Sequence, residues 1–218
     1  MKLAIVILNW NGIELLKKFL KPLLTYNNEN EIYVIDNNSS DDSINYIKSN
    51  FPTIKIIENP KNYGYAKGYN EGLKKINADI LCLLNNDVEV TQNWINPIMN
   101  EFKNNSTTAA IQPKILNHKN KDYFDYAGAA GGFIDCLGYP YCDGRIYNII
   151  EKDNKQYDYN KDIFWASGAC LFIRKEVFIN LNGFDESYFN HMEEIDLCWR
   201  ILKSGFKINI YTNPKYFM

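Results

Sequence analysis

The chain has 218 residues, of which 46% are hydrophobic and 15% aromatic, so it is long enough to bury a sizeable core as one domain. Its formal net charge is -2 at pH 7 and its lysines are scattered, which argues against a basic surface of the kind that binds nucleic acid. The apolar run at the N-terminus is short, and no small-residue cleavage site follows it. No stretch approaches the roughly 18 apolar residues of a membrane-spanning helix. We therefore expect a cytoplasmic protein, with peripheral contact to the inner face of a membrane left open.

The chain contains five cysteines, an odd number, and has no C-x-x-C pair. Cys82, Cys170 and Cys198 lie within apolar patterns, where a small buried thiol is expected. This usage is typical of a reducing compartment, and the spacings needed for a sulfur-ligated metal are missing.

In the first half of the chain, continuous apolar runs alternate with stretches of helical periodicity. Strands are expected over residues 3–8, 31–36, 54–57 and 80–84. Helices are expected over residues 13–24, around 44–47 and within 62–72, the second of them capped by the Ser and Asp residues that precede it. This alternation predicts right-handed βαβ units, and hence an α/β fold whose mostly parallel sheet is flanked by helices.

The segment between the third and fourth strands carries three glycines four residues apart, at Gly64, Gly68 and Gly72. Glycine within a helix costs up to about 1 kcal/mol against alanine. Three on one helical face therefore require a compensating close approach. The neighbour that approaches is either the sheet or a ligand, and the sequence leaves both interpretations open.

The second half of the chain is less regular. Residues 117–162 are rich in Gly, Tyr and Asp without a sustained period, which is typical of a functional loop or a disordered segment. Their many aromatic side chains argue for order. Regularity returns over residues 163–173, where a turn is expected to lead into a strand. A short helix, a turn over 182–186 and a helix from about 193 to 204 follow.

The fourth strand ends abruptly in Asn85, Asn86 and Asp87. In open parallel sheets, ligands gather at the carboxyl ends of the strands. Carboxylate and amide oxygens suit Mg²⁺ or Mn²⁺ shared with the phosphates of a ligand. Asp36 ends the second strand at the same edge and could accept hydrogen bonds from a base or a ribose. The alternative is that these residues merely begin turns, where Asn and Asp are common.

Two common nucleotide-binding motifs are missing. The chain has no G-x-x-x-x-G-K-[ST] loop, and the first strand is followed by Asn9-Trp10-Asn11-Gly12 instead of a dinucleotide fingerprint. A nucleotide held through an acidic strand end and a bridging cation therefore fits this sequence better than NAD.

The helix expected near the end of the chain begins with two glutamates. Glu194 shares its face with apolar residues, so desolvation raises the pKa of its carboxyl group while the helix N-terminus favours the anion. A carboxylate in such surroundings can act as a general base. Glu193 is interpreted as either a substrate contact or an acid that favours the helix dipole. Asp196 and Arg200 are spaced for an ion pair, and His191 is either a metal ligand or a hydrogen-bonded loop residue.

Taken in order along the chain, these motifs resemble the inverting family-2 glycosyltransferases with the GT-A fold, in particular the branch of bacterial rhamnosyltransferase-like enzymes. Residues 34–43 resemble the V-D-N-x-S-x-D-x-S signature, residues 62–72 match N-x-G-x-A-x-G-x-N-x-G position for position, and residues 85–87 stand where the family has its D-x-D variant. Further matches are the opening strand at 5–11, Ser167-Gly168-Ala169, the turn at 183–186 and the helix start at 193–197. Each motif alone is weak, but together they are specific.

The resemblance implies a single GT-A domain over residues 1–218 with a Rossmann-like sheet. Residues 1–112 would form the nucleotide-sugar-binding half, and the irregular residues 113–218 the acceptor-binding half. Asp87 would bind the divalent cation, Mn²⁺ or Mg²⁺, and Glu194 would be the catalytic base. The nucleotide-sugar contacts implied by the matching motifs are Leu8, Asn9, Asp36, Asn62, Gly64, Asn70, Asn85 and Asn86. The implied acceptor or sugar contacts are Trp165, Gly168, Ala169, Glu193 and Arg200.

The implied reaction moves a sugar from a UDP- or dTDP-sugar to a hydroxyl of a glycan or lipid-linked acceptor, with inversion, in cell-surface polysaccharide synthesis. Trp165 and the aromatic residues of 117–162 would form an acceptor platform, or else pack in the core. The sequence leaves the oligomeric state open.

The sequence departs from the family pattern in two places. The usual Glu-Asp pair is Glu193-Glu194 here, which leaves the choice of base between the two open. The chain ends at Met218, about where many relatives carry a histidine, and a truncation there would weaken metal binding or activity. Two other functions stay open. One is a sugar nucleotidyltransferase, which normally has a basic glycine-rich loop after the first strand; the other is a non-catalytic nucleotide-sugar or glycan-binding module.

Overall fold

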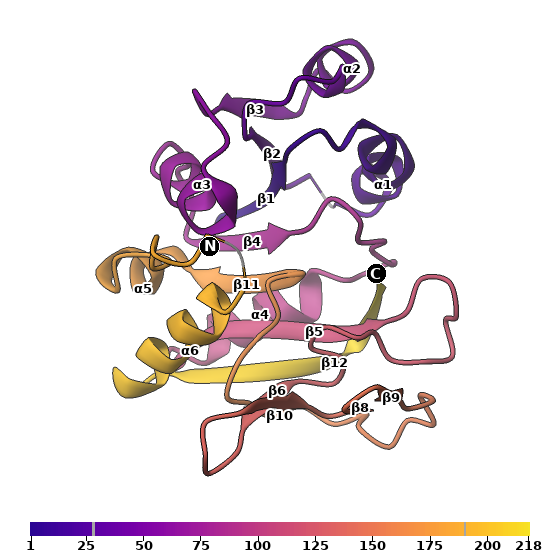
Figure 1. Cartoon of the computed structure of the whole chain (residues 1–218), viewed down its shortest axis with the longest axis vertical. Helices are drawn as coiled ribbons and strands as arrows, with labels where there is room; N and C mark the ends of the chain where they lie inside the picture. Colours follow the sequence, from indigo (N-terminus) through magenta and orange to yellow (C-terminus); the bar gives the residue numbers. More distant parts are fainter. Residues whose placement is uncertain (28, 190) are drawn as a thin grey trace.

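The computed structural model describes residues 1–27, 29–189 and 191–218, without the side chains of 213–215. Over these residues the chain forms a main sheet of eight strands with the order β10-β12-β5-β11-β4-β1-β2-β3 (Figure 1). The strands are β1 (Leu3–Asn9), β2 (Glu31–Asp36), β3 (Lys55–Glu58), β4 (Ile80–Leu84), β5 (Thr108–Leu116), β10 (Lys161–Asp162), β11 (Cys170–Arg174) and β12 (Lys207–Phe217).

Several strands of this sheet end at one common edge. β1 pairs in parallel with β2 and β4, and β2 pairs in parallel with β3. β11 is antiparallel to both β4 and β5, so β4 and β5 run in the same direction. The register sets Asn9, the last residue of β1, directly beside Asp36, the last residue of β2. The mostly parallel α/β sheet expected from the sequence is confirmed, and we refer to the edge where β1, β2, β4 and β5 end as the carboxyl edge.

Helices cover both faces of the main sheet (Figure 1). They are α1 (Ile13–Thr25), α2 (Ser43–Asn50), α3 (Gly64–Leu73), α4 (Asn96–Asn104), α5 (Lys175–Asn180) and α6 (Glu193–Lys203). α1, α2 and α4 contribute to one buried apolar cluster, with Leu20 and Phe102 among its members. α3, α5 and α6 contribute to a second cluster, with Tyr69 and Phe178 among its members. Burying each such side chain contributes about 1.5–3 kcal/mol.

The boundaries of the early elements agree closely with the sequence pattern. β2 and β4 have the expected bounds, and β3 begins and ends one residue later than expected. The expected capping of α2 is different in detail, because the N-cap residue Asp42 makes no side-chain capping hydrogen bond. Asp41 instead accepts hydrogen bonds from the backbone N–H of Ser43 at 3.1 Å and of Ile13 at 3.0 Å. One carboxylate therefore serves the first residues of two helices.

The glycines of α3 allow it to pack closely on the sheet. A Cβ atom added to Gly72 would lie 2.2 Å from the side chain of Ile35 on β2, and one added to Gly68 would lie 3.1 Å from the side chain of Leu8 on β1. Of the two interpretations left open by the sequence, these contacts support close packing of helix on sheet at both positions.

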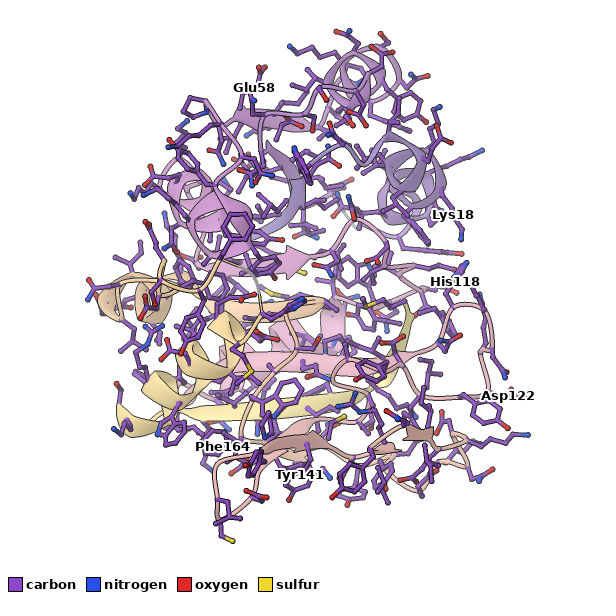
Figure 2. The ribbon with its side chains drawn as sticks, viewed as in Figure 1. Lys18, Glu58, His118, Asp122, Tyr141 and Phe164 are labelled. Carbon is purple, nitrogen blue, oxygen red and sulfur yellow. The ribbon has the colours of Figure 1, made fainter. Side chains whose placement is uncertain are left out.

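The irregular region 117–162 contains a second, smaller sheet. Its strands are β6 (Gly132–Ile134), β7 (Pro140–Cys142), β8 (Arg145–Ile146) and β9 (Ile149–Ile150), paired antiparallel in that order. These strands are only two or three residues long, so they leave no periodic signal in the sequence. Figure 2 shows Glu58 on β3 and Tyr141 on β7 at opposite ends of the molecule. The order that the aromatic content predicted for this region is confirmed.

The cysteines of the described chain are all free. Cys82, Cys170 and Cys198 are buried, as the apolar pattern predicted, and Cys142 is buried as well. Cys136 is exposed. A search of the described residues finds no helix with the length and apolar character needed to span a bilayer.

Candidate active site

The carboxyl edge carries an acidic side chain with an unpaired oxygen. Asp87 follows β4, and its buried Oδ1 atom has no hydrogen-bond partner among the described residues. Burial raises the pKa of Asp87. The pKa of Asp125, which is also buried, is raised by burial and further by the charge of Asp87. Two carboxylates in this arrangement favour a nearby cation, because uncompensated buried charge is costly.

The residues at Asp87 fit a hard divalent cation that takes most of its ligands from elsewhere. Within the described ranges, no three His, Cys, Asp or Glu side chains come together as a metal cage. Mg²⁺ is usually bound in this way, through one or two carboxylates together with water and substrate phosphates. Asp87, with its buried and unpaired Oδ1, offers one such carboxylate ligand.

Asn85 and Asn86 connect the end of β4 to neighbouring segments. The side-chain amide of Asn86 donates a hydrogen bond to Oδ1 of Asn9 at 3.2 Å, and the backbone N–H of Asn85 donates to the carbonyl oxygen of Ala169 at 2.9 Å. Gly12 makes the first contact possible, since a Cβ atom there would lie 2.4 Å from both amide atoms involved. The requirement for Gly12 was missed in the sequence, where no local pattern marks it.

Asp36 has its hydrogen-bond partners within the protein. Its Oδ1 atom accepts from the side chains of Asn9 at 3.2 Å and Ser39 at 2.6 Å, and its Oδ2 atom accepts from the backbone N–H of Ser39 at 2.8 Å. Both Asp36 and Asn9 are buried. Asp36 therefore fixes the loop that follows β2, and its contact with a nucleotide base stays a prediction.

A small cavity opens beside the N-terminus of α3. Asn62 orders this corner, because its Oδ1 atom accepts hydrogen bonds from Asn37 at 3.0 Å and from the backbone N–H of Gly64 at 2.9 Å. Gly64 has φ +75°, and a Cβ atom there would lie 2.6 Å from the carbonyl oxygen of Phe189. The cavity measures about 260 Å³ and is lined by Leu8, Trp10, Asn37, Asn62, Gly64, Tyr65 and Phe189. Three of the expected nucleotide-sugar contacts thus share one cavity, together with the exposed Trp10, which the sequence did not single out.

Asn70, expected from its motif to contact the nucleotide, makes hydrogen bonds within the protein. Its side-chain Nδ2 donates to the carbonyl oxygen of Phe184 at 2.8 Å, and its Oδ1 accepts from the backbone N–H of Phe184 at 3.0 Å. Gly183 has φ +67°, and a Cβ atom there would lie 2.5 Å from Oδ1 of Asn70. Asn70 is buried and holds the turn after α5 against α3, and its contact with a nucleotide stays a prediction.

Glu193 and Glu194 begin α6 and both have an unpaired oxygen. Among the described residues, the buried Oε2 atom of each lacks a hydrogen-bond partner. Burial raises the pKa of Glu193 to about 7, and the charge of Glu194 adds to the effect. Burial also raises the pKa of Glu194, while the backbone N–H of Gly168 and the charge of His191 favour its anion. The apolar surroundings expected for Glu194 are confirmed.

The backbone before these glutamates is strained. His191 and Met192 both have φ 73°, a left-handed conformation that costs a non-glycine residue about 1–2 kcal/mol. Such conformations persist where the surrounding structure enforces them, and they cluster at functional sites. The strain therefore marks the start of α6 as a candidate functional position.

The loop 167–169 joins the two acidic positions. The carbonyl oxygen of Ala169 binds the Asn85 backbone, and the backbone of Gly168 faces Glu194. The hydroxyl of Tyr65 on α3 donates to the carbonyl oxygen of Gly168 at 2.9 Å. The pKa of Tyr65 is raised mainly by burial, and also by the charges of Glu194 and Glu193. The motifs around Asp87 and Glu194, more than 100 residues apart in sequence, meet at this loop.

Two expected acceptor contacts have structural roles instead. Trp165 is buried, with its ring in the core and its Nε1 donating to the carbonyl oxygen of Phe133 at 2.9 Å, so it forms no exposed platform. Arg200 donates to Asp196 at 2.6 and 2.9 Å and to the carbonyl oxygen of Leu181 at 2.6 Å. These bonds confirm the predicted Asp196–Arg200 pair and use three of the five N–H donors of the guanidinium group. Of the two interpretations left open for Trp165, the structure supports core packing, and the acceptor contact of Arg200 stays a prediction.

An open α/β sheet with unpaired buried carboxylates at its carboxyl edge defines the general class, that of ligand-binding enzymes whose site lies at the strand ends. The family model for glycosyl transferase family 2 matches residues 4–181. The chain belongs to glycosyl transferase family 2, and the resemblance seen in its motifs is confirmed.

Curated relatives cover most of this chain. It is 25% identical over 211 residues to the low-salt glycan biosynthesis hexosyltransferase Agl10 of Haloferax volcanii, an alignment that covers 94% of this chain and 63% of that protein. It is 24% identical over 215 residues to the N-acetylglucosaminyl-diphospho-decaprenol L-rhamnosyltransferase of Mycobacterium tuberculosis. This alignment covers 90% of this chain and 68% of that protein. The chain thus spans about two thirds of the length of these relatives.

Solved structures agree on the fold. GalNAc-T7, solved with UDP, GalNAc and Mn²⁺, has a TM-score of 0.78 at 16% identity, covering 99% of this chain and 42% of that one. A mannosyltransferase from Pyrobaculum calidifontis, solved with GDP-mannose and Mn²⁺, has a TM-score of 0.70 at 11% identity. The match covers 100% of this chain and 56% of that one. The fold is that of the GT-A glycosyltransferases, as the motifs predicted.

Proposed function

We propose that this chain is a metal-dependent inverting glycosyltransferase. It would move a sugar from a UDP- or dTDP-sugar to a hydroxyl of a glycan or lipid-linked saccharide, in cell-surface polysaccharide synthesis. The observation that carries the proposal is the pair of unpaired, buried carboxylate oxygens on Asp87 and Glu194, held on either side of the loop 167–169. The family and the relatives support glycosyl transfer. The name of the mycobacterial relative describes a rhamnosyltransferase whose acceptor is a sugar linked to decaprenol through a diphosphate.

The donor would lie along the carboxyl edge of the sheet. The cavity beside α3, with Leu8, Asn62 and Gly64 in its lining, supports a nucleotide position next to β1 and β2. Asn85 and Asn86 would keep the diphosphate close to Asp87. A lipid-linked acceptor would bring the protein to the inner face of a membrane.

Asp87 would hold Mn²⁺ or Mg²⁺ against the diphosphate of the donor. When bound, such a cation stabilises the negative charge that develops on the departing diphosphate. Its binding would also compensate the buried charges of Asp87 and Asp125. The cation would therefore favour the ionised form of both groups.

Glu194 is the better candidate for the base. A base must be ionised before it reacts, and the Gly168 backbone N–H and His191 favour the Glu194 anion. Glu193 has a pKa of about 7, so near neutral pH it is protonated in about half of the molecules. In the proposed step, Glu194 takes the proton of the acceptor hydroxyl as that oxygen bonds to the anomeric carbon. The bond to the diphosphate breaks on the opposite face, and a single displacement inverts the configuration.

The test is turnover of defined donors by the purified chain. UDP- and dTDP-sugars are incubated with Mn²⁺ and with N-acetylglucosaminyl diphosphate carrying a short alkyl chain, a soluble version of the acceptor named for the mycobacterial relative. We expect release of nucleoside diphosphate and a product of inverted configuration by NMR. Release of pyrophosphate would instead indicate a nucleotidyltransferase, and donor binding without any turnover would indicate a binding module.

A further inference from the structure

We propose that a tyrosine-lined hollow on the small sheet binds the saccharide part of the acceptor. This inference rests on the proposed function, and it names the part of the molecule that recognises the second substrate. The hollow measures about 560 Å³, and the residues used in the argument are Tyr126, Asp135, Tyr139, Tyr141, Arg145 and Tyr147. We refer to it as the tyrosine hollow.

The four tyrosines leave their rings unusually open to solvent. Tyr126, Tyr139 and Tyr141 are exposed, and Tyr147 is 90% exposed. Exposed apolar surface gathered in one hollow marks a binding site more often than chance. Tyrosine combines a flat apolar ring with a hydroxyl group, so it can pack on the C–H face of a sugar while bonding to the sugar hydroxyls. The composition therefore favours a saccharide over a purely apolar ligand.

The backbone at Tyr147 adds a second, independent observation. Tyr147 lies in the tight turn between β8 and β9 with φ 52°, in the left-handed region that favours glycine. A bulky residue there costs about 1–2 kcal/mol, and a side chain 90% exposed regains almost nothing through packing. A strained backbone whose side chain gains no packing energy in the folded protein is characteristic of a binding position.

The hollow is built on rigid supports. Tyr141 stacks on Phe133 with ring centroids 5.6 Å apart, and the carbonyl oxygen of Phe133 accepts the hydrogen bond from buried Trp165. Gly144, in the turn between β7 and β8, lies so close to buried Phe124 that a Cβ atom would be 2.6 Å from its ring. Trp165 thus supports the aromatic surface from beneath. Prior ordering of the site reduces the entropy lost on binding.

Polar groups complete the hollow. The guanidinium carbon of Arg145 lies over the ring of Tyr126, 3.9 Å from its centroid, a cation–π contact. Arginine offers five N–H donors, suited to sugar hydroxyls or to a phosphate attached to the sugar. Asp135 also lines the hollow and orders its chain segment, because its Oδ1 accepts from the backbone N–H groups of Leu137 at 2.8 Å and Tyr139 at 2.9 Å.

The hollow begins close to the carboxyl edge of the main sheet. Phe124 forms an isolated β-bridge with Leu116, the last residue of β5. Because β5 and β4 run in the same direction, this bridge lies at the same edge as Asp87. Tyr126 follows Phe124 by two residues. A saccharide in the hollow can therefore extend from the tyrosines toward the site of transfer.

A lipid surface is the competing occupant. Leu137 and Ile149 are exposed nearby but lie outside the lining of the hollow, whereas the exposed Ile146 is part of it. A bilayer needs a protruding apolar surface, whereas this site is concave and contains Arg145 and Asp135. The geometry thus favours a saccharide, and a membrane becomes one outcome of the test.

The test uses two substitutions to glycine at left-handed positions. Y147G removes the ring and relieves the strained backbone, so the protein should fold at least as stably as before. K155G is the matched control, because Lys155 is exposed, has φ 65° and lies outside the hollow. The probes are N-acetylglucosaminyl diphosphate with a short alkyl chain and a panel of short oligosaccharides, followed by saturation-transfer NMR and calorimetry without donor.

We expect Y147G to weaken probe binding about tenfold while its Tm is unchanged or higher, and K155G to bind like the original chain. Unchanged probe affinity in Y147G, or no binding of any probe by the original chain, would overturn the proposal. The proposal would also be overturned if Y147G lost binding to anionic phospholipid vesicles but kept its binding to the saccharide probes. That result would identify the hollow as a membrane contact. Donor binding, followed by thermal shift with UDP- and dTDP-sugars, reports separately on the proposed function.

Discussion

The backbone N–H of Asn85 donates a 2.9 Å hydrogen bond to the carbonyl oxygen of Ala169. This bond joins the turn that carries Asp87 to the loop whose Gly168 N–H favours the Glu194 anion. The two carboxylates with proposed chemical roles are thus positioned by one short piece of backbone. Substitutions at each should therefore separate donor binding from proton transfer.

Replacing Asp87 should remove the dependence of donor binding on a divalent cation. A donor at about 100 times its Kd stabilises the folded protein by about 2.7 kcal/mol. In the original chain, we expect the donor to raise the Tm only when Mn²⁺ is present. In D87A, we expect adding Mn²⁺ to make no difference to the Tm measured with donor. D122A is the control, because Asp122 lies at the periphery on an exposed loop (Figure 2). An Mn²⁺-dependent shift that survives in D87A would remove the metal role from this residue.

Replacing Glu194 should slow transfer without weakening donor binding. A positioned general base contributes about 10²–10⁴-fold to the rate, so E194Q should lower kcat by that range with an unchanged thermal shift by donor. E193Q should have a smaller effect, because Glu193 is already protonated in part near neutral pH. Single-turnover assays compare the two variants. Near-normal transfer by E194Q together with an inactive E193Q would assign the base to Glu193.

The stability of the folded chain should fall as the pH rises from about 4.5 to about 7. Folding raises the pKa of Glu193 from 4.5 to about 7, so the folded state binds more protons than the unfolded state in this window. The free energy of unfolding therefore decreases with pH, by up to about 3 kcal/mol from this group. Urea denaturation of the original chain and E193Q at pH 5 and pH 7.5 measures the effect. A pH dependence that is identical in both proteins would contradict the assignment.

Replacing Asn70 should cost stability and leave the nucleotide site intact. N70A removes two hydrogen bonds to the backbone of Phe184 and leaves that buried N–H and C=O unpaired, a loss of about 2–4 kcal/mol. N45A is the control, because Asn45 is exposed and its side chain donates to the neighbouring Asp42 at 2.8 Å. Urea denaturation gives the stability, and calorimetry with donor at low temperature gives the affinity. Weaker donor binding at unchanged stability would instead support a nucleotide contact by Asn70.

The local sequence was enough to predict the elements that run through the core. Continuous apolar runs gave β2 and β4 their bounds, because a strand covered on both faces must be apolar throughout. The sequence also placed Asp87 at a strand end and Glu194 on an apolar helix face, since both facts depend only on the period of one element. The family could be assigned from the order of such motifs along the chain.

The tertiary structure decided which polar groups remain available. Asn70 matched its motif, yet both of its amide atoms are taken by Phe184, 114 positions later. Trp165 looked like a platform from its sequence surroundings, but the small sheet covers it and carries the exposed rings instead. A short-range pattern fixes which way a side chain points along its own element. Only the packing of distant segments determines what meets that side chain, and hence whether it is buried, paired or free to bind.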